Sequence, residues 1–99
     1  MELGRNDAWI FEMRGIVLLD LNRYQEALDS FRNAYDLNSD SWYLYSMGRC
    51  LRGLERYEEA IKRLEKSLKL IEADEEENGH DRVDEKLFIC SELGNLYGV

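Results

Sequence analysis

The sequence predicts an all-α fold of about five helices that form antiparallel hairpins. Its 99 residues include no proline, which is the residue that most often interrupts a helix. Apolar residues recur at steps of three and four along most of the chain, which is the spacing of one helix face. The segment from Leu21 to Leu37 also aligns with the segment from Leu54 to Leu70 at an offset of 33 residues, which indicates a structural repeat.

The alignment extends beyond these segments and keeps similar residues in register. The matching pairs are Trp9 with Trp42, Gly15 with Gly48, Tyr24 with Tyr57, Ala27 with Ala60, Phe31 with Leu64 and Ala34 with Ser67. We therefore expect two units of the same layout, a first hairpin over residues 8–40 and a second hairpin over residues 41–74.

Each unit contains two apolar-periodic segments around a short polar break, near residues 20–23 and near residues 53–56. The residues that predict the helices of the first unit are Trp9, Ile10, Met13, Val17 and Leu18, then Tyr24, Ala27, Leu28, Phe31, Ala34 and Tyr35. Those of the second unit are Trp42, Leu44, Met47 and Leu51, then Tyr57, Ala60, Ile61, Leu64 and Leu68. Two such segments joined by a tight turn predict a helical hairpin.

Small residues mark where the two helices of each hairpin must come closest. Gly15 and Gly48 lie in mid-helix, where glycine costs about 1 kcal/mol relative to alanine. Because both recur in register with Ala27 and Ala60, we expect them to let the backbones approach while an aromatic side chain of the partner helix fills the space.

The composition argues against several classes of function. The formal net charge is −8, from 13 Lys and Arg against 21 Asp and Glu, and this excess of acids opposes binding to nucleic acid or to anionic lipid. No apolar run approaches the roughly 20 residues of a membrane span, and the first residues lack the apolar centre of a secretory signal. We therefore expect a cytoplasmic protein. Cys50 and Cys90 have no CxxC spacing, so we expect reduced thiols packed as small apolar groups.

The repeated residues resemble the tetratricopeptide repeat family, whose signature is W-x2-L-G-x2-Y, then A-x3-F, then P. The matching residues are Phe11, Gly15, Leu18, Ala27 and Phe31 in the first unit, Leu44, Met47, Gly48, Leu51, Ala60 and Leu64 in the second, and Cys90, Leu93, Gly94 and Tyr97 in a partial third match. Arg14, Ser39 and Glu72 depart from the signature. The resemblance implies a short right-handed solenoid in which residues 87–99 are the first helix of a partial third repeat.

The resemblance also implies a protein-protein interaction module or scaffold, not an enzyme, whose concave groove is lined by the first helix of each repeat. By helical spacing, the residues expected there are Trp9, Glu12, Ile16, Leu19, Trp42, Tyr45, Arg49, Arg52, Phe88, Ser91 and Asn95. This mixture favours an extended or helical peptide, with an acidic or C-terminal segment preferred because two arginines lie one turn apart. No cofactor is expected.

Other interpretations of these residues stay open. The aromatic residues Trp9, Trp42 and Phe88 are also expected if they only cover the joints between repeats, and the two arginines if they only pair with neighbouring glutamates. Family members that bind chaperone tails use Lys, Asn and Arg in this groove. Glu12, Ile16 and Val99 occupy the corresponding places, so the resemblance disfavours that mode.

An acidic connector over residues 75–86 lengthens the spacing before the third match. Asp74, Glu76, Asn78, Gly79 and Glu85 approximate a calcium-loop pattern, although Glu76 is longer than the usual ligand at its position. The preferred interpretation is that the preceding helix extends by a charged turn or two and ends at Asn78-Gly79 in a left-handed cap. His80 is the single histidine, so no His-based metal cluster is expected.

A structural role is the main alternative function. The chain would then be a spacer in a longer solenoid, or it would form a homodimer through the final helix, whose apolar residues Leu93, Leu96 and Tyr97 lack a following helix.

Overall fold

Five α-helices form the described part of the chain in a computed structural model, which covers residues 7–79 and 83–97. The helices are α1 (Ala8–Asp20), α2 (Tyr24–Leu37), α3 (Ser41–Gly53), α4 (Tyr57–Asn78) and α5 (Val83–Tyr97). These residues contain no strand, which confirms the expected all-α class. No helix within these ranges combines the length and the apolar character needed to cross a membrane. His80 and Val99 lie outside the described residues.

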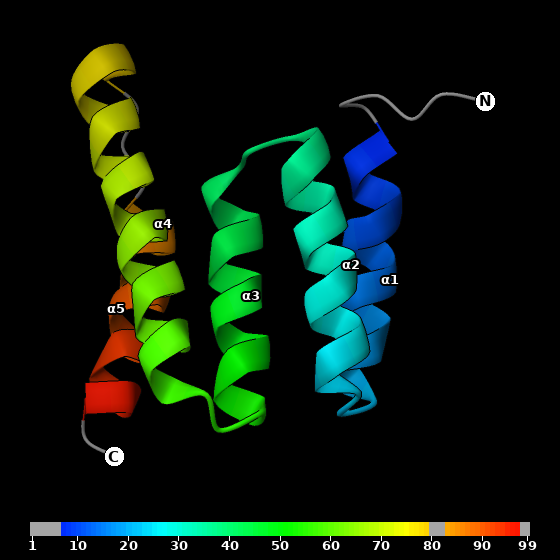
Figure 1. The fold of residues 1–99 in the computed structure, drawn as a ribbon. Coiled ribbons are helices and arrows are strands. Elements are labelled where there is room, and N and C mark those ends of the chain that lie inside the picture. The colour runs from blue at the N-terminus through cyan, green and yellow to red at the C-terminus, as the bar shows by residue number, and fades with distance from the viewer. Residues whose placement is uncertain (1–6, 80–82, 98–99) are drawn as a thin grey trace.

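The helices form two antiparallel hairpins followed by a single helix (Figure 1). In this view α1 lies behind α2 and α5 lies behind α4, while α3 stands between the two pairs. The packing of α2 against α3 joins the hairpins. Contacts near both ends of α5 fix its direction: Lys86 Nζ lies 2.9 Å from Glu75 Oε1, and the Tyr97 hydroxyl donates a hydrogen bond of 3.3 Å to Glu65 Oε2. α5 therefore runs back along α4.

The two turns within the hairpins share one left-handed geometry. Asn22 has a φ of 61° in the first turn, and Glu55 has a φ of 62° in the second. The residues that follow them, Arg23 and Arg56, each donate an amide hydrogen bond of 2.9 Å to a carbonyl in the last turn of the preceding helix. This arrangement is a Schellman motif, which satisfies carbonyls that the end of a helix leaves free.

Gly15 and Gly48 lie where the helices of each hairpin touch, as the repeat predicts. A Cβ added to Gly15 would lie 2.8 Å from the Phe31 ring, and one added to Gly48 would lie 2.7 Å from Leu64 Cγ. Neither distance leaves room for a methyl group, so glycine allows α1 to reach α2 and α3 to reach α4. The aromatic expected in this space is present in the first hairpin, where Phe31 fills it, but the expectation is wrong for the second hairpin, where Leu64 fills it.

The buried face of α1 is not the one that its large apolar residues suggest. The exposed residues, with 45% to 60% of their surface open, are Trp9, Ile10, Met13 and Val17. The buried residues are Ala8, Gly15 and Leu18. Since apolar residues surround most of α1, their spacing predicts a helix without selecting its packed side. The glycine selects that side, because only there can α2 come close.

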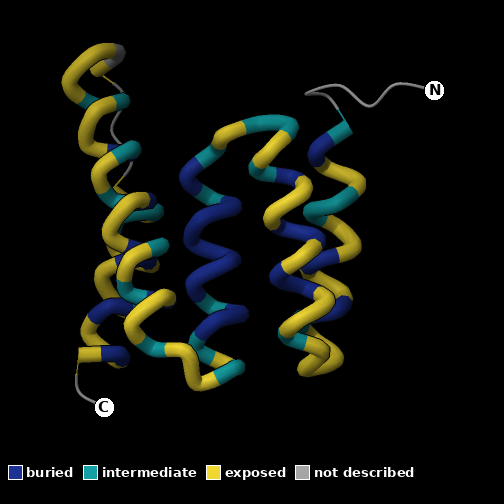
Figure 2. Tube along the Cα trace, in the orientation of Figure 1, coloured by how far each residue is buried: buried dark blue, intermediate teal, exposed yellow. Residues whose placement is uncertain are grey.

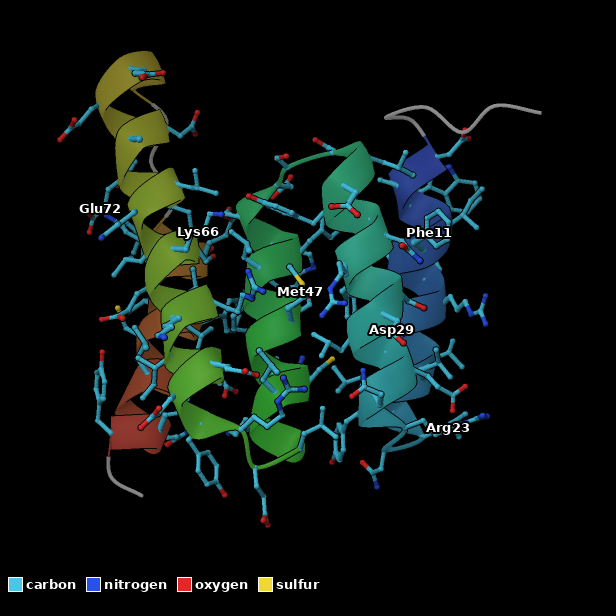
Figure 3. The ribbon with its side chains drawn as sticks, in the orientation of Figure 1. Phe11, Arg23, Asp29, Met47, Lys66 and Glu72 are labelled. Carbon is cyan, nitrogen blue, oxygen red and sulfur yellow. The ribbon has the colours of Figure 1, made fainter. Side chains whose placement is uncertain are left out.

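α3 is buried along most of its length because α2 packs on one side of it and α4 on another (Figure 2). Figure 3 shows Met47 on the side of α3 that faces α2, and this side chain is 2% exposed. At the start of the helix, Asp40 Oδ1 accepts a hydrogen bond of 2.9 Å from the Trp42 amide. Ser67 of α4 donates a hydrogen bond of 2.8 Å to the Ser41 carbonyl. The start of α3 is therefore held by its own cap and by α4.

Among its described residues, the acidic segment predicted as a connector is helical except at Gly79. α4 continues to Asn78 and ends at Gly79, whose φ of 69° is left-handed, and this confirms the expected end of the helix. Residues 83–86 already belong to α5. Asp74 and Glu76 thus lie in a helix and not in a calcium-binding loop. Within residues 7–79 and 83–97, no group of three or more His, Cys, Asp or Glu is placed to hold a metal ion.

The two cysteines differ in burial. Cys50 is buried in the core, whereas Cys90 is exposed. The expectation that both thiols pack as small apolar groups is therefore right for Cys50 and wrong for Cys90. The reason is that the buried residues of α5, which are Ile89, Leu93 and Leu96, all lie on the side that packs against its neighbours.

We predict that Gly48→Ala destabilises the protein by about 1 kcal/mol, because crowding against Leu64 outweighs the gain in helix propensity. Gly94→Ala is the matched control, since nothing lies within 4 Å of a Cβ built on Gly94. The same gain in propensity should stabilise that variant by about 0.5–1 kcal/mol. Urea denaturation measures both free energies of unfolding. Equal stability of the two variants would show that the contact in the second hairpin is loose.

We also predict that Glu55→Asn stabilises the protein by about 0.5–1 kcal/mol, because asparagine adopts the left-handed conformation with less strain than glutamate. The chain provides its own reference, because Asn22 occupies the equivalent place in the first turn. Asn22→Glu should act in the opposite direction, and it also removes a 3.0 Å hydrogen bond from the Tyr24 hydroxyl to Asn22 Oδ1. Thermal unfolding compares the two variants, and a loss of stability in Glu55→Asn would contradict the argument.

Candidate functional site

The residues predicted to line a groove lie on α1, α3 and α5, and we call the surface that they form the first-helix face. Trp42 of α3 is central to it. Its side chain hydrogen-bonds to Glu12 of α1, and its ring lies 5.0 Å from the Tyr45 ring, measured between centroids. The face therefore crosses the joint between the two hairpins without a break. This position also matches the alternative that Trp42 covers the joint.

Tyr45 is almost fully enclosed, which corrects the expectation that it offers its ring to a partner. It is 7% exposed, because Trp42 lies on one side and Phe88 of α5 lies 6.5 Å away between ring centroids. The Arg49 guanidinium lies 5.9 Å from the centre of the same ring. Burial raises the pKa of the Tyr45 phenol above its usual value, so the side chain stays neutral. It belongs to the packed interior of the face, against Trp42 and Phe88.

Arg52 connects α3 to α5. Its Nη1 atom lies 3.0 Å from Glu92 Oε2, although this oxygen has no hydrogen-bond partner with suitable geometry. The contact is therefore an ion pair, as the alternative of pairing with a glutamate predicts. The glutamate is Glu92 of α5, a residue that the sequence alone did not identify.

A hollow of about 370 Å³ lies beside the two arginines, between the end of α1 and the end of α3. The residues that line it are Leu19, Asp20, Asn22, Tyr24, Arg49, Arg52 and Gly53. Leu19 and the arginines were expected on this face. Gly53 is the last residue of α3. Asp20, Asn22 and Tyr24 lie in or beside the turn of the first hairpin, and spacing within a helix cannot reveal them because they meet α3 only when the hairpins stack.

The remaining predicted residues lie on the outer parts of the face. Trp9 is 60% exposed, Phe88 is 53% exposed and Ile16 is 38% exposed. Ser91 and Asn95 are exposed polar residues of α5. The face thus has a packed centre on α3 and open aromatic or aliphatic groups on α1 and α5, an arrangement that can bind a chain laid across the three helices.

Nucleophilic chemistry has little support in this region. Cys50 lies next to Arg49 in the chain, but burial raises the pKa of its thiol to about 12. A thiol with this pKa is protonated at neutral pH and is a poor nucleophile.

The pKa of Glu12 gives this face a pH dependence. Desolvation by burial is the main cause that raises this pKa above 4.5, the nearby charge of Asp40 adds to it, and the hydrogen bond with Trp42 acts in the opposite direction. Because the folded state then binds the proton more tightly than the unfolded state, stability falls as the pH rises from about 4.5 through the folded pKa. The charged carboxylate therefore destabilises the fold at neutral pH.

We predict that Glu12→Gln raises the melting temperature at pH 7, because glutamine is uncharged and keeps an oxygen that can accept the Trp42 hydrogen bond. The advantage should disappear at about pH 4, where the carboxyl group is protonated in both states. Thermal unfolding of the wild type and the variant across this range measures the difference. An advantage that is the same at every pH would show that the charge of Glu12 is not its cause.

The comparison with protein families finds a match to a tetratricopeptide repeat model over residues 18–81 of the chain. The comparisons with curated proteins and with solved structures find no match. Tetratricopeptide repeats generally mediate protein–protein interaction and are typically non-catalytic scaffolds. The matched residues include the second helix of the first hairpin and the whole second hairpin, so the chain belongs to the tetratricopeptide repeat family.

Proposed function

We propose that this chain is a non-catalytic scaffold that binds a peptide or a partner helix across the first-helix face, in the concave groove of a short solenoid. The observation that carries this proposal is the continuous row from Glu12 through Trp42 and Tyr45 to Phe88, which joins three helices. A row of this kind gives a partner one surface to contact instead of three separate helices. α5, which spans Val83–Tyr97, acts in it as the first helix of the partial third repeat that we expected over residues 87–99.

The open aromatic groups supply the contact area. Trp9 and Phe88 lie at the two ends of the face and are more than half exposed. Aromatic side chains bury a large area at low cost in conformational entropy, which is why they dominate the energetics of many interfaces. A peptide that spans the face would contact one of them at each end and pass over the covered ring of Tyr45 between them.

The hollow beside Arg49 supplies a place for a carboxylate. Arg52 is already paired with Glu92, whereas Arg49 contacts only the Tyr45 ring among the interactions seen in the described residues. Asp20 also lines the hollow and repels further negative charge, so the site favours one carboxylate over a run of them. A C-terminal carboxylate or a single acidic side chain of the partner fits this description.

A second candidate function is association through the ends of the stack. α1 exposes Trp9, Ile10 and Met13 on its outer side, and α5 exposes Leu87 and Tyr97. An apolar area of this kind commonly marks a surface that another protein covers. A further repeat or a second copy of the chain would then cover it. Leu93 and Leu96, which we expected in such a homodimer, are buried within the molecule, so they take no part in it.

The groove is tested by binding the intact chain to an array of peptides with free C-termini and internal acidic residues. Arg49→Gln should weaken the selected peptides by about three- to tenfold, since a charge-assisted contact is lost. Arg14→Gln removes the same charge from an exposed position of α1 and should leave binding unchanged. Melting temperatures confirm that both variants are folded.

Two results would count against the groove. The first is an array on which no peptide binds. The second is binding that survives Arg49→Gln but is lost in Leu87→Glu, because Leu87 is 62% exposed on α5. That second result would favour association through the end of the stack.

A further inference from the structure

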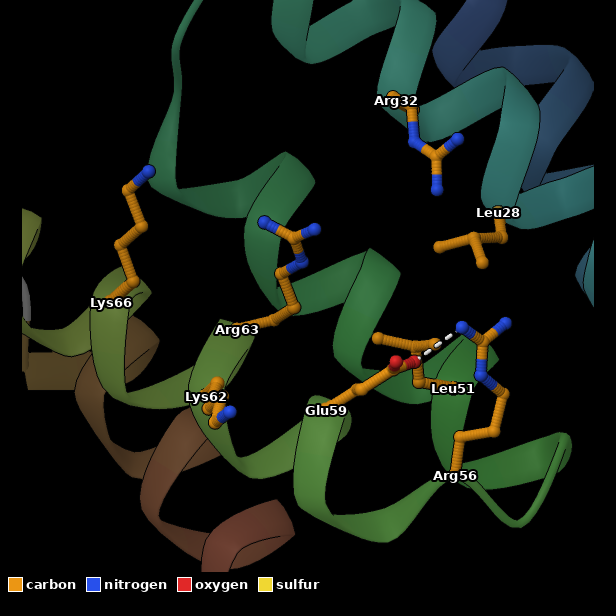
Figure 4. Close-up of a pocket in the computed structure, with 8 residues that line it drawn as sticks. All are labelled: Leu28, Arg32, Leu51, Arg56, Glu59, Lys62, Arg63 and Lys66. Atoms are coloured by element: carbon orange, nitrogen blue, oxygen red, sulfur yellow. Dashed lines mark ion pairs between the residues drawn. The ribbon is translucent and has the colours of Figure 1, made fainter.

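A cleft lined mainly by cationic side chains lies between α2 and α4 and encloses about 390 Å³ (Figure 4). The residues that line it are Leu28, Arg32, Leu51, Arg56, Glu59, Lys62, Arg63 and Lys66. It is separate from the first-helix face, as two adjacent residues of α3 show. Arg52 reaches Glu92 on α5, whereas Leu51 lines the cleft between α2 and α4.

The cleft concentrates positive charge in a chain that is acidic as a whole. Five of its lining residues are Arg or Lys and one is Glu, although the chain has 13 basic residues against 21 acidic ones. Glu59 is already paired with Arg56, at 2.5 Å. Across residues 7–79 and 83–97, no ion pair involves Arg32, Lys62 or Arg63. The fold therefore gains no ion pair from these three cations.

The charges form a row and do not converge on one point. Arg56 directly precedes α4 and Lys66 lies on it, ten residues further along the chain, which corresponds to about 15 Å along a helix. Figure 4 shows Arg32 reaching from α2 and Arg63 reaching from α4 toward the same opening. Asp29, labelled in Figure 3, belongs to α2 but does not line the cleft. The cleft thus presents cations on both walls over nearly three helical turns.

The shape and chemistry of the cleft identify the class of ligand. A row of cations about 15 Å long matches a segment with several negative charges better than it matches a single phosphate. Leu28 and Leu51 also line the cleft, but they are only 2% and 3% exposed, so the cations and not apolar contact select the ligand. A nucleic acid would extend beyond the cleft and meet the acidic surface of a chain with a net charge of −8. A protein segment with several acidic side chains fits the length and the charge of the row.

We propose that the cleft between α2 and α4 binds an acidic segment of a partner protein. Its carboxylates contact Arg32, Lys62 and Arg63. This site is a second surface, and it does not depend on the peptide groove proposed above. The two surfaces would allow one chain to hold two partners at the same time.

The test uses the intact chain and a fluorescent synthetic peptide in which glutamate and serine alternate. Its affinity should fall as salt rises, because the contacts are electrostatic. The triple variant Arg32→Gln, Lys62→Gln and Arg63→Gln should bind it about tenfold more weakly. A control triple variant, Arg14→Gln, Arg23→Gln and Lys69→Gln, removes the same charge from exposed positions outside both proposed surfaces. It should bind the peptide as tightly as the wild type does. Thermal unfolding shows whether both variants are folded.

Several results would overturn the proposal. The proposal is wrong if the glutamate peptide does not bind at low salt. It is also wrong if a peptide with glutamine in place of glutamate binds equally well. Equal weakening in the control variant would assign the effect to net charge, and weakening in Arg49→Gln but not in the cleft variant would place the peptide in the groove. Tighter binding of inorganic triphosphate or single-stranded DNA than of the peptide would show that the ligand class is wrong. The cleft variant and Arg49→Gln therefore separate failure of the cleft from failure of the first-helix face.

Discussion

The close approach of the two helices in each hairpin is the constraint on which the other contacts depend. The Phe31 ring and the Leu64 side chain occupy the space that a Cβ on Gly15 or Gly48 would take, and both side chains are fully buried. A larger residue at either glycine would force the helices apart, because a packed interior has no free volume for it. The second helix of each hairpin, α2 or α4, would then shift relative to α3. The contacts that α3 makes with both helices would change.

The stacking of the hairpins follows from this approach and creates both candidate surfaces. Tyr24, at the start of α2, lies so close to Gly53 that a Cβ there would be 2.5 Å from its ring. This contact brings the first turn to the end of α3, so that Asp20 and Arg49 line one hollow. The cleft between α2 and α4 likewise takes one wall from each hairpin. Neither surface exists within a single repeat.

The sequence predicts what is local or repeated and misses what depends on neighbours. The helices, the turns and the contacts of Gly15 and Gly48 follow from spacing and register. The burial of Tyr45 does not, because it requires Phe88 of α5, a helix outside the two aligned units. The packed side of α1 was missed because nearly all sides of that helix are apolar. The cations of α4 recur at helical spacing in the sequence, so their shared face can be predicted. Arg32 joins them only because α2 stacks beside α4.

The two surfaces differ in how far the protein itself neutralises them. On the first-helix face, Glu92 pairs with Arg52 and Asp20 lies beside Arg49, so little charge is left for a partner and apolar contact must contribute most of the affinity. In the cleft, several cations have one carboxylate among them. Electrostatic interactions at physiological salt are screened beyond about 8 Å. A ligand segment inside the cleft therefore responds to these nearby cations more than to the distant acids, and an acidic protein can carry a site for an acidic partner.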